Sequence, residues 1–238
     1  MPKHQKKSLW NIYKARFNRP GRGIEKDEPK KTGLALFFEV LSEEWLELIK
    51  LNFLILIFCI PIFTIPAAFT ASSKIMLCMF RRKTYYVFSD FFSSFLAEFV
   101  RATAVGFFYF AFAAALAFSM VSYFFLFAQS VVFVFLAALC IIVMILIFFV
   151  GFYLFPMVAA TALKPMDYLK NSIFLAILCL KNNVLIALIV LLISIVSIVL
   201  FPYTVFFILL IVPAFIGFII TFFAYAGIKK YIVKDEAF

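Results

Sequence analysis

The sequence predicts an all-α fold, a polytopic bundle of transmembrane helices. Of the 238 residues, 66% are hydrophobic and 14% are charged, and the mean hydropathy is +1.12. A soluble domain is typically about 45–50% apolar and about 25% charged, so this chain has too few polar side chains to cover a surface that faces water. The charges are also unevenly placed, because residues 102–163 and 182–228 contain none.

The first 32 residues are set apart by their positive charge. Residues 1–31 hold ten of the 22 basic side chains and three acidic ones, a net charge of +7. Such a segment gains about 1 kcal/mol per basic side chain from anionic lipid head groups near a membrane surface. We therefore expect residues 1–32 to be a cytoplasmic tail that binds lipid head groups and no nucleic acid. A transmembrane helical domain over residues 33–231 and a short cytoplasmic C-terminal tail over residues 232–238 would follow.

Residues 51–82 are the first apolar region, and two prolines interrupt it. Pro61 and Pro66 lie near its middle, where proline disfavours a continuous helix. A helix that ends near Ile60 and another that begins near Ala67 would form a hairpin of two spans.

The second arm of this hairpin, Ala67–Phe80, is short for a span. Its 14 residues cover about 21 Å as a helix, and they include Lys74. A lysine inside the bilayer costs about 2.5–3.5 kcal/mol unless it is paired or reaches the surface. Either neighbouring helices shield this arm or it is re-entrant, which would give five spans plus a re-entrant arm.

Each of the two uncharged stretches is long enough for two spans of about 20 residues. The turns between them are expected near residues 128–130 and 201–203. The span over Val131–Thr161 is longer than a bilayer core requires, and Gly151 and Pro156 are positions at which it can bend. These stretches therefore predict a second and a third hairpin.

An amphipathic segment precedes each predicted hairpin. The three segments are residues 36–50, 90–102 and 167–183, and their apolar side chains recur with the helical period of 3.6. We expect interfacial helices that lie in or enter the membrane surface. Asp90 and Asp167 stand where an N-cap carboxylate would accept free backbone N–H groups.

Basic residues cluster in four places: the N-terminal tail, residues 74–101, residues 164–181 and the C-terminal tail. Short basic loops lie in the cytoplasm, so each pair of neighbouring clusters must be separated by an even number of crossings. The sequence thus predicts six spans, arranged as three hairpins, with both termini in the cytoplasm.

No pattern typical of catalysis or metal binding is present. His4 is the single histidine, the four cysteines have no Cys-x-x-Cys spacing, and no glycine-rich phosphate loop occurs. Proton relays in membranes use acidic or basic side chains within the spans, and the uncharged stretches supply none. We expect a protein that is not an enzyme and that has no cofactor or metal.

The charged residues closest to the apolar regions are the candidate contacts for a partner or substrate. Lys74 is the one charged side chain at the expected membrane depth, although a lysine of this kind also commonly extends to the surface. The full set is Lys74, Arg81, Arg82, Lys83, Asp90, Arg101, Asp167 and Lys170.

Four segments in the first half of the chain carry a resemblance to a known family. They are FNRPGRGIEKDEPKK (17–31), LFFEVL…LIKLN (36–52), IPIFTIPAAFTA (60–71) and FRRKTYYVFSDFFSSF (80–95). In these segments the chain resembles the YesL-like family of bacterial integral membrane proteins, except that Pro66 stands where similar proteins often have Gly. Members of that family commonly belong to carbohydrate-utilisation gene clusters that also encode ABC sugar importers.

Three functions follow as alternatives. The resemblance implies an accessory or component subunit of a carbohydrate ABC import system in the bacterial plasma membrane, with permease or ATPase subunits as partners. A stand-alone transporter or channel would need a polar path, for which Lys74 and scattered hydroxyl groups are the candidates. A membrane scaffold or sensor would act through the lipid-binding basic tail.

Overall fold

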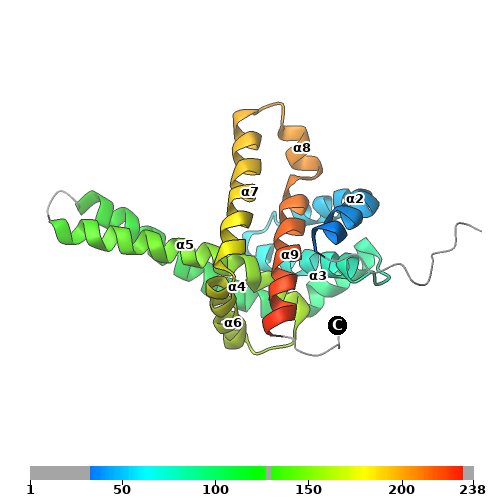
Figure 1. Ribbon diagram of the computed structural model, residues 1–238, viewed down its shortest axis with the longest axis horizontal. Helices are drawn as coiled ribbons and strands as arrows, with labels where there is room; N and C mark the ends of the chain where they lie inside the picture. Colours follow the sequence, from blue (N-terminus) through cyan, green and yellow to red (C-terminus); the bar gives the residue numbers. More distant parts are fainter. Residues whose placement is uncertain (1–32, 127–129, 233–238) are drawn as a thin grey trace, which may run out of the picture.

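The computed structural model describes residues 33–126 and 130–232, and all regular elements in this part of the chain are helices (Figure 1). The predicted polytopic helical bundle is confirmed. Three predicted features lie wholly or partly outside the described residues: the N-terminal tail over residues 1–32, the turn predicted near residues 128–130, of which residues 128 and 129 are outside, and the C-terminal tail, of which residues 233–238 are outside. In chain order the elements are α2 (Leu34–Phe58), η1 (Ile62–Thr64), α3 (Ile65–Phe80), α4 (Val87–Leu126), α5 (Val131–Ala160), α6 (Pro165–Leu178), α7 (Leu180–Val199), α8 (Val205–Leu210) and α9 (Val212–Tyr231).

Among the described residues, five helical segments are long and apolar enough to cross a membrane: η1 with α3, α4, α5, α7 and α9. The prediction of six spans is therefore wrong in its count. The helix that is not apolar enough to cross a membrane is α2, which contains the first arm of the first predicted hairpin. Four charged residues, Glu43, Glu44, Glu47 and Lys50, lie in its central part. The alternative prediction placed the incomplete arm at Ala67–Phe80. Together with η1, this arm is long and apolar enough to count, but 67% of its apolar window is buried inside the protein and so does not face lipid.

Pro61 and Pro66 break the chain close to the predicted positions. α2 ends at Phe58, η1 follows Pro61, and α3 begins at Ile65 with Pro66 in its first turn. Proline is favoured there because its missing N–H group would have no helical partner in any case. The predicted turn at residues 201–203 separates α7 from α8.

The amphipathic segments are not three separate helices. Residues 36–50 belong to α2, which departs from helical geometry only at Glu44 (φ −108°, ψ 15°), and residues 90–102 belong to α4, which is continuous over 40 residues. Neither helix contains a proline, so nothing ends the helix where the polarity changes. The third segment, residues 167–183, is divided: residues 167–178 lie in α6 and residues 180–183 begin α7, because the two helices meet at the non-helical Cys179 (φ −100°, ψ 25°).

Buried amide side chains satisfy backbone groups where helices are interrupted. At the break between α6 and α7, Asn183 donates to the carbonyl oxygen of Ala176 at 2.9 Å. At the break between α8 and α9, Asn52 donates to the carbonyl oxygen of Leu209 at 2.8 Å and accepts from the N–H of Ala214 at 2.9 Å. Unpaired backbone groups are costly in an apolar interior, so these amides permit the breaks.

Asp90 and Asp167 are not N-cap residues as predicted. Each lies in the first turn of its helix, because α4 already begins at Val87 and α6 at Pro165. Asp90 instead reaches back, and its Oδ2 accepts from the backbone N–H of Tyr86 at 2.8 Å. A carboxylate in the first turn also interacts favourably with the positive end of the helix dipole.

The centre of the core is α3, which packs against α2, α4, α5 and α9. Where α3 crosses α4, the backbone of Gly106 lies so close to Pro66 that a Cβ atom at position 106 would overlap the proline ring. At the next crossing, a Cβ atom on Gly151 of α5 would overlap the hydroxyl group of Tyr109. The first of these contacts determines how closely α3 and α4 approach.

Two helical arms extend from this core in different directions. One consists of the distal parts of α4 and α5, and the other of α7 and α8 (Figure 1). In α4, α5 and α7, only 11% of each most apolar window is buried inside the protein. The exposed side chains of these arms are mostly Phe, Leu, Ile and Val, so lipid is the medium that suits them.

Candidate functional site

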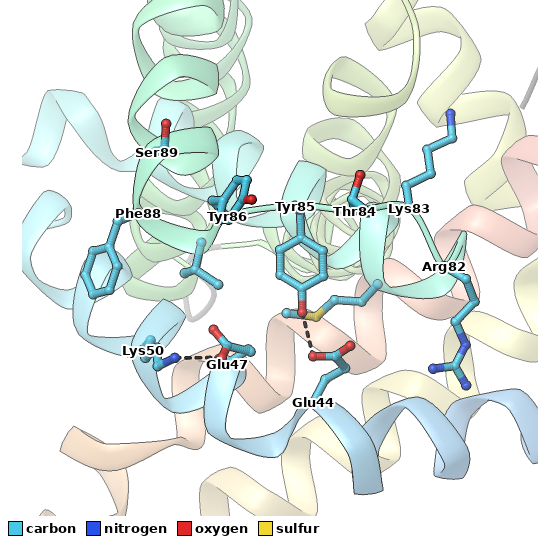
Figure 2. Close-up of a pocket in the computed structure, with 12 residues that line it drawn as sticks. Glu44, Glu47, Lys50, Arg82, Lys83, Thr84, Tyr85, Tyr86, Phe88 and Ser89 are labelled. Atoms are coloured by element: carbon cyan, nitrogen blue, oxygen red, sulfur yellow. Dashed lines mark hydrogen bonds and ion pairs between the residues drawn. The ribbon is translucent and has the colours of Figure 1, made fainter. Parts of the chain in front are cut away.

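A groove lies between α2 and the loop that joins α3 to α4, and we call it the charged groove. Its volume is about 840 Å³. Figure 2 shows acidic side chains from α2 on one wall and the loop residues on the other. Its lining residues are Glu44, Glu47, Lys50, Met79, Arg82, Lys83, Thr84, Tyr85, Tyr86, Val87, Phe88 and Ser89.

The loop begins with a Schellman motif at the end of α3. The N–H of Arg82 donates to the carbonyl oxygen of Met79, and the N–H of Lys83 donates to that of Cys78, each at 3.1 Å. This motif requires a left-handed residue at the position of Arg82, where glycine is usual. Arg82 adopts it with φ 53°, at a cost of about 1–2 kcal/mol for a residue with a Cβ atom.

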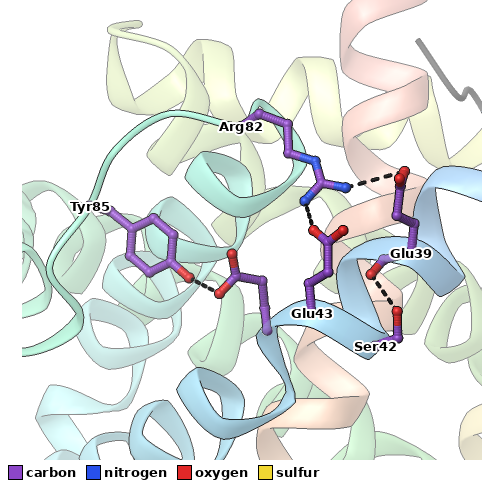
Figure 3. A network of polar contacts seen from close by, with 6 residues as sticks. Glu39, Ser42, Glu43, Arg82 and Tyr85 are labelled. Carbon is purple, nitrogen blue, oxygen red and sulfur yellow. Dashed lines mark hydrogen bonds and ion pairs between the residues drawn. The ribbon is translucent and has the colours of Figure 1, made fainter. Parts of the chain in front are cut away.

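The side chain of Arg82 bridges two glutamates of α2. Its guanidinium forms ion pairs with Glu43 and, at 3.2 Å, with Glu39, as Figure 3 shows. Burial alone would lower the pKa of Arg82, but the hydrogen bond and charge of Glu43, together with those of Glu39, outweigh it and raise the pKa. The loop is thereby fixed to a helix about 40 positions earlier in the chain.

Two further polar contacts line the charged groove. The hydroxyl of Tyr85 donates to Glu44 Oε2 at 2.6 Å, and Lys50 pairs with Glu47 at 2.6 Å (Figure 2). Burial, followed by the hydrogen bond to Glu44 and its negative charge, raises the pKa of the Tyr85 phenol well above its ordinary value. The phenol of Tyr85 is therefore protonated at neutral pH and can donate to Glu44. Lys83 points away from the glutamates (Figure 2).

The structure brings three of the predicted contact residues to this groove. Arg82 and Lys83 line it. Asp90 lies beside it and holds the backbone of Tyr86, itself a lining residue.

Two predicted residues of α3 lie elsewhere. Lys74 is half-buried in the middle of the helix. Arg81 ends the helix, and its guanidinium lies 5.2 Å from the ring centroid of Tyr225 in α9. Arg81 therefore helps to attach α3 to α9 through a cation–π contact.

The remaining predicted residues are also separate from the groove. Arg101 pairs with Glu98 on the same helix at 3.0 Å. Asp167 and Lys170 lie on α6, and neither lines the charged groove.

Sequence reasoning did not identify the glutamates that line the groove or those that pair with Arg82. Glu39, Glu43, Glu44 and Glu47 looked like the solvated face of an amphipathic helix. One signal was available: Glu39 and Glu43 are four residues apart and so share one helix face. The sequence did not show that the basic residues 81–83 lie opposite this face in the folded chain. Tyr85 gave no local signal.

The charged groove presents charged, hydroxyl and aromatic side chains. In the described residues, no group of three or more His, Cys, Asp or Glu side chains is arranged to hold a metal ion. The two acids that line it, Glu44 and Glu47, are engaged with Tyr85 and Lys50. Of the residue types that line the groove, Tyr, Phe, Met and Arg are enriched at protein interfaces, whereas Lys and Glu are depleted there.

Comparison with known proteins gives one match. Residues 48–120 match the model of a family described as a protein of unknown function, DUF624. No curated protein and no solved structure matches the chain significantly. The matched segment is less than a third of the chain and contains the end of α2, all of α3 and most of α4. Over this segment, which includes the loop of the charged groove, the chain is similar to a family of bacterial membrane proteins that includes YesL-like members.

Proposed function

We propose that this chain is a non-enzymatic membrane subunit that docks a cytoplasmic partner protein at the charged groove. The observation that carries the proposal is Arg82, which occupies a strained backbone position and holds the loop against α2 through two glutamates. Strained residues persist where the surrounding structure holds them, and they cluster at functional sites. A preformed surface binds a partner at a lower entropic cost than a mobile one.

The surface beside the groove has the composition of a protein interface. Phe88 lines the groove and begins an exposed apolar stripe along α4 that continues through Phe92, Leu96 and Val100 at intervals of four residues. Tyr86, at 78% exposure, stands beside it. An apolar stripe next to a charged rim fits an amphipathic helix of a partner.

The partner that we propose is a subunit of a carbohydrate ABC importer, either its ATPase or its permease. The resemblance to the YesL-like family supports this choice. The basic loop residues Arg81, Arg82 and Lys83 support a cytoplasmic location for the groove, in line with the distribution of positive charge in membrane proteins. The protein would then act in the bacterial plasma membrane through contact with its partner, without catalysing a reaction itself.

Photo-crosslinking in native membranes tests this function. A photoreactive amino acid is placed at Tyr86 on the rim, at Phe92 on the stripe, and at Phe118 on the lipid-facing arm of α4 as a control. We expect mass spectrometry to find ATPase or permease chains crosslinked to positions 86 and 92 but not to position 118. Lys83→Glu should lower the yield at position 86.

Two outcomes would overturn the proposal. Crosslinks to lipid alone at positions 86 and 92 would refute a docking surface. Crosslinks to a protein that belongs to no importer would refute the partner.

A further inference from the structure

The apolar stripe of α4 has a neighbouring row of small and polar residues that is also open on the surface. The stripe consists of Phe88, Phe92, Leu96 and Val100, all exposed. Each residue of the neighbouring row follows one residue of the stripe, and the row consists of Ser89, Ser93, Ala97 and Arg101. Its first three residues are exposed and Arg101 is partly exposed. Only one of these two rows therefore has the composition of a surface that faces water.

The unbroken course of α4 keeps most of the stripe away from lipid. α4 is one helix from Val87 to Leu126, so its charged part continues along the axis of its uncharged part and does not turn into the membrane plane. Phe88 lies about 20 Å beyond Arg101 along this axis, whereas the head groups add only about 5–8 Å on each side of the hydrocarbon. Large apolar side chains are unfavourable in water, so a protein surface is the cover that suits this part of the stripe.

The stripe also continues into the membrane with the same spacing of four residues. After Val100 come Ala104, which is half-buried, and Phe108, which is exposed. Val100 is 79% exposed and directly precedes Arg101, the last charged residue of α4. It therefore lies at the level of the lipid head groups, and the apolar surface passes this level without interruption.

A soluble protein and a membrane protein would cover such a stripe differently. A soluble protein could contact Phe88 and Phe92, but it would have to displace polar head groups to reach Val100, and removing polar groups from water is costly. A helix that leaves the bilayer beside α4 covers the stripe on both sides of the boundary without this cost.

We propose that a transmembrane helix of the partner, continued into the cytoplasm, packs along the apolar stripe of α4. This inference rests on the proposed function, and it selects the integral permease from the two candidate partners named there.

The spacing of the stripe also limits where the partner helix lies. Side chains four residues apart form a ridge that packs into the groove of a neighbouring helix. The exposed part of this ridge ends at Phe112, because Leu116 is half-buried. Phe118 lies six residues beyond Phe112 and about 120° around the helix. Lipid, and not the partner helix, should therefore face Phe118.

Photo-crosslinking along α4 in native membranes tests this inference with the full-length protein. A photoreactive amino acid is placed at Phe92 in the cytoplasmic part, at Val100 at the boundary and at Phe108 within the hydrocarbon. Ser93 on the neighbouring row and Phe118 on another face are the matched controls. Mass spectrometry identifies the crosslinked chains before and after an alkaline carbonate wash, which removes peripheral proteins. We expect the same integral chain at positions 92, 100 and 108, retained after the wash, and little of it at the two controls.

Two substitutions on the exposed surface test the role of the stripe itself. Leu96→Ser removes an apolar contact from the middle of the stripe and should lower the yields at positions 92 and 100 about tenfold. Ser93→Ala changes the neighbouring row and should leave both yields unchanged. Equal yields in Leu96→Ser and the native protein would overturn the packing along the stripe.

The crosslinked species separate this inference from the proposed function. An importer chain at position 92 that the wash removes, with lipid alone at positions 100 and 108, would overturn the membrane helix and leave docking at the charged groove intact. Crosslinks from positions 92 and 100 to residues 1–32 of the same chain, or to a second copy, would give the stripe another occupant and also overturn it. Lipid alone at positions 86 and 92 would overturn both proposals.

Discussion

At the scale of single residues, Arg82 combines two opposing contributions to stability. Its backbone is left-handed, which is unfavourable for a residue with a Cβ atom. Its side chain pairs with Glu39 and Glu43, but it is 41% exposed, and ion pairs in such places contribute about 0–1 kcal/mol. Stability alone therefore does not favour arginine over glycine here, which agrees with a role in shaping the charged groove.

Two substitutions separate these contributions. Arg82→Ala removes the ion pairs and keeps the backbone strain, whereas Arg82→Gly removes both. We expect Arg82→Gly to be more stable than Arg82→Ala by about 1 kcal/mol, measured by denaturant unfolding in detergent. Both variants should give weaker partner crosslinks from position 86. If the two variants unfold at the same denaturant concentration, the backbone of Arg82 is not strained.

At the scale of helices, the sequence predicted those boundaries that have local signals. Proline at positions 61 and 66 and the turn at 201–203 end helices nearly where expected, and α5 covers Val131–Ala160 against a predicted Val131–Thr161. The sequence could not show which polar residues meet. The Arg82–Glu43 contact, for example, joins residues 39 positions apart. The sequence also did not predict that α4 is unbroken, because a change from polar to apolar residues resembles a helix boundary.

The crossing of α3 and α4 gives a prediction at this scale. Gly106→Ala would force a methyl group against the rigid ring of Pro66, and overpacking of this kind costs about 1–3 kcal/mol. Gly217→Ala is the matched control, because its methyl group would lie 3.2 Å from the flexible end of Met76 and alanine is the better helix former. We expect thermal unfolding in detergent to show a lower midpoint for Gly106→Ala only.

A second substitution tests the cause of that loss. Adding Pro66→Gly to Gly106→Ala removes the ring and should restore part of the stability. If the two positions clash directly, the double variant should be more stable than the sum of the two single destabilisations predicts. A double variant whose loss of stability equals that sum would contradict a direct clash.

At the scale of the whole molecule, the length of α4 constrains how the protein sits in the bilayer. Its 40 residues extend about 60 Å, roughly twice the thickness of the hydrocarbon core. Residues 102–126 are uncharged and extend about 37 Å, which is enough to cross, whereas residues 87–101 contain Asp90, Glu98 and Arg101. The charged part of α4 should therefore project from the hydrocarbon into the cytoplasmic interface.

The placement of α4 also determines where α3 and its Lys74 lie relative to the membrane. The start of α3 meets α4 at Gly106, and only the residues of the connecting loop separate its end from the start of α4. α3 therefore runs beside the charged part of α4, inside a shell of protein. Lys74 on α3 then lies at the level of the interface, and its charge no longer carries the cost of a lysine in hydrocarbon.

Cysteine labelling measures this boundary directly. Ala97 and Ala111 are both exposed alanines of α4, about 21 Å apart along its axis, and each is replaced by cysteine in a variant whose native cysteines, Cys59, Cys78, Cys140 and Cys179, are replaced by alanine. In purified protein in nanodiscs, a membrane-impermeant maleimide should label Ala97→Cys rapidly and leave Ala111→Cys unlabelled until detergent is added. Because thiolate reacts and water is needed to form it, the difference reports the surrounding medium and not only steric access. Equal protection of the two positions would place the charged part of α4 within the membrane. Glu98 and Arg101 would then require partners beyond their mutual ion pair.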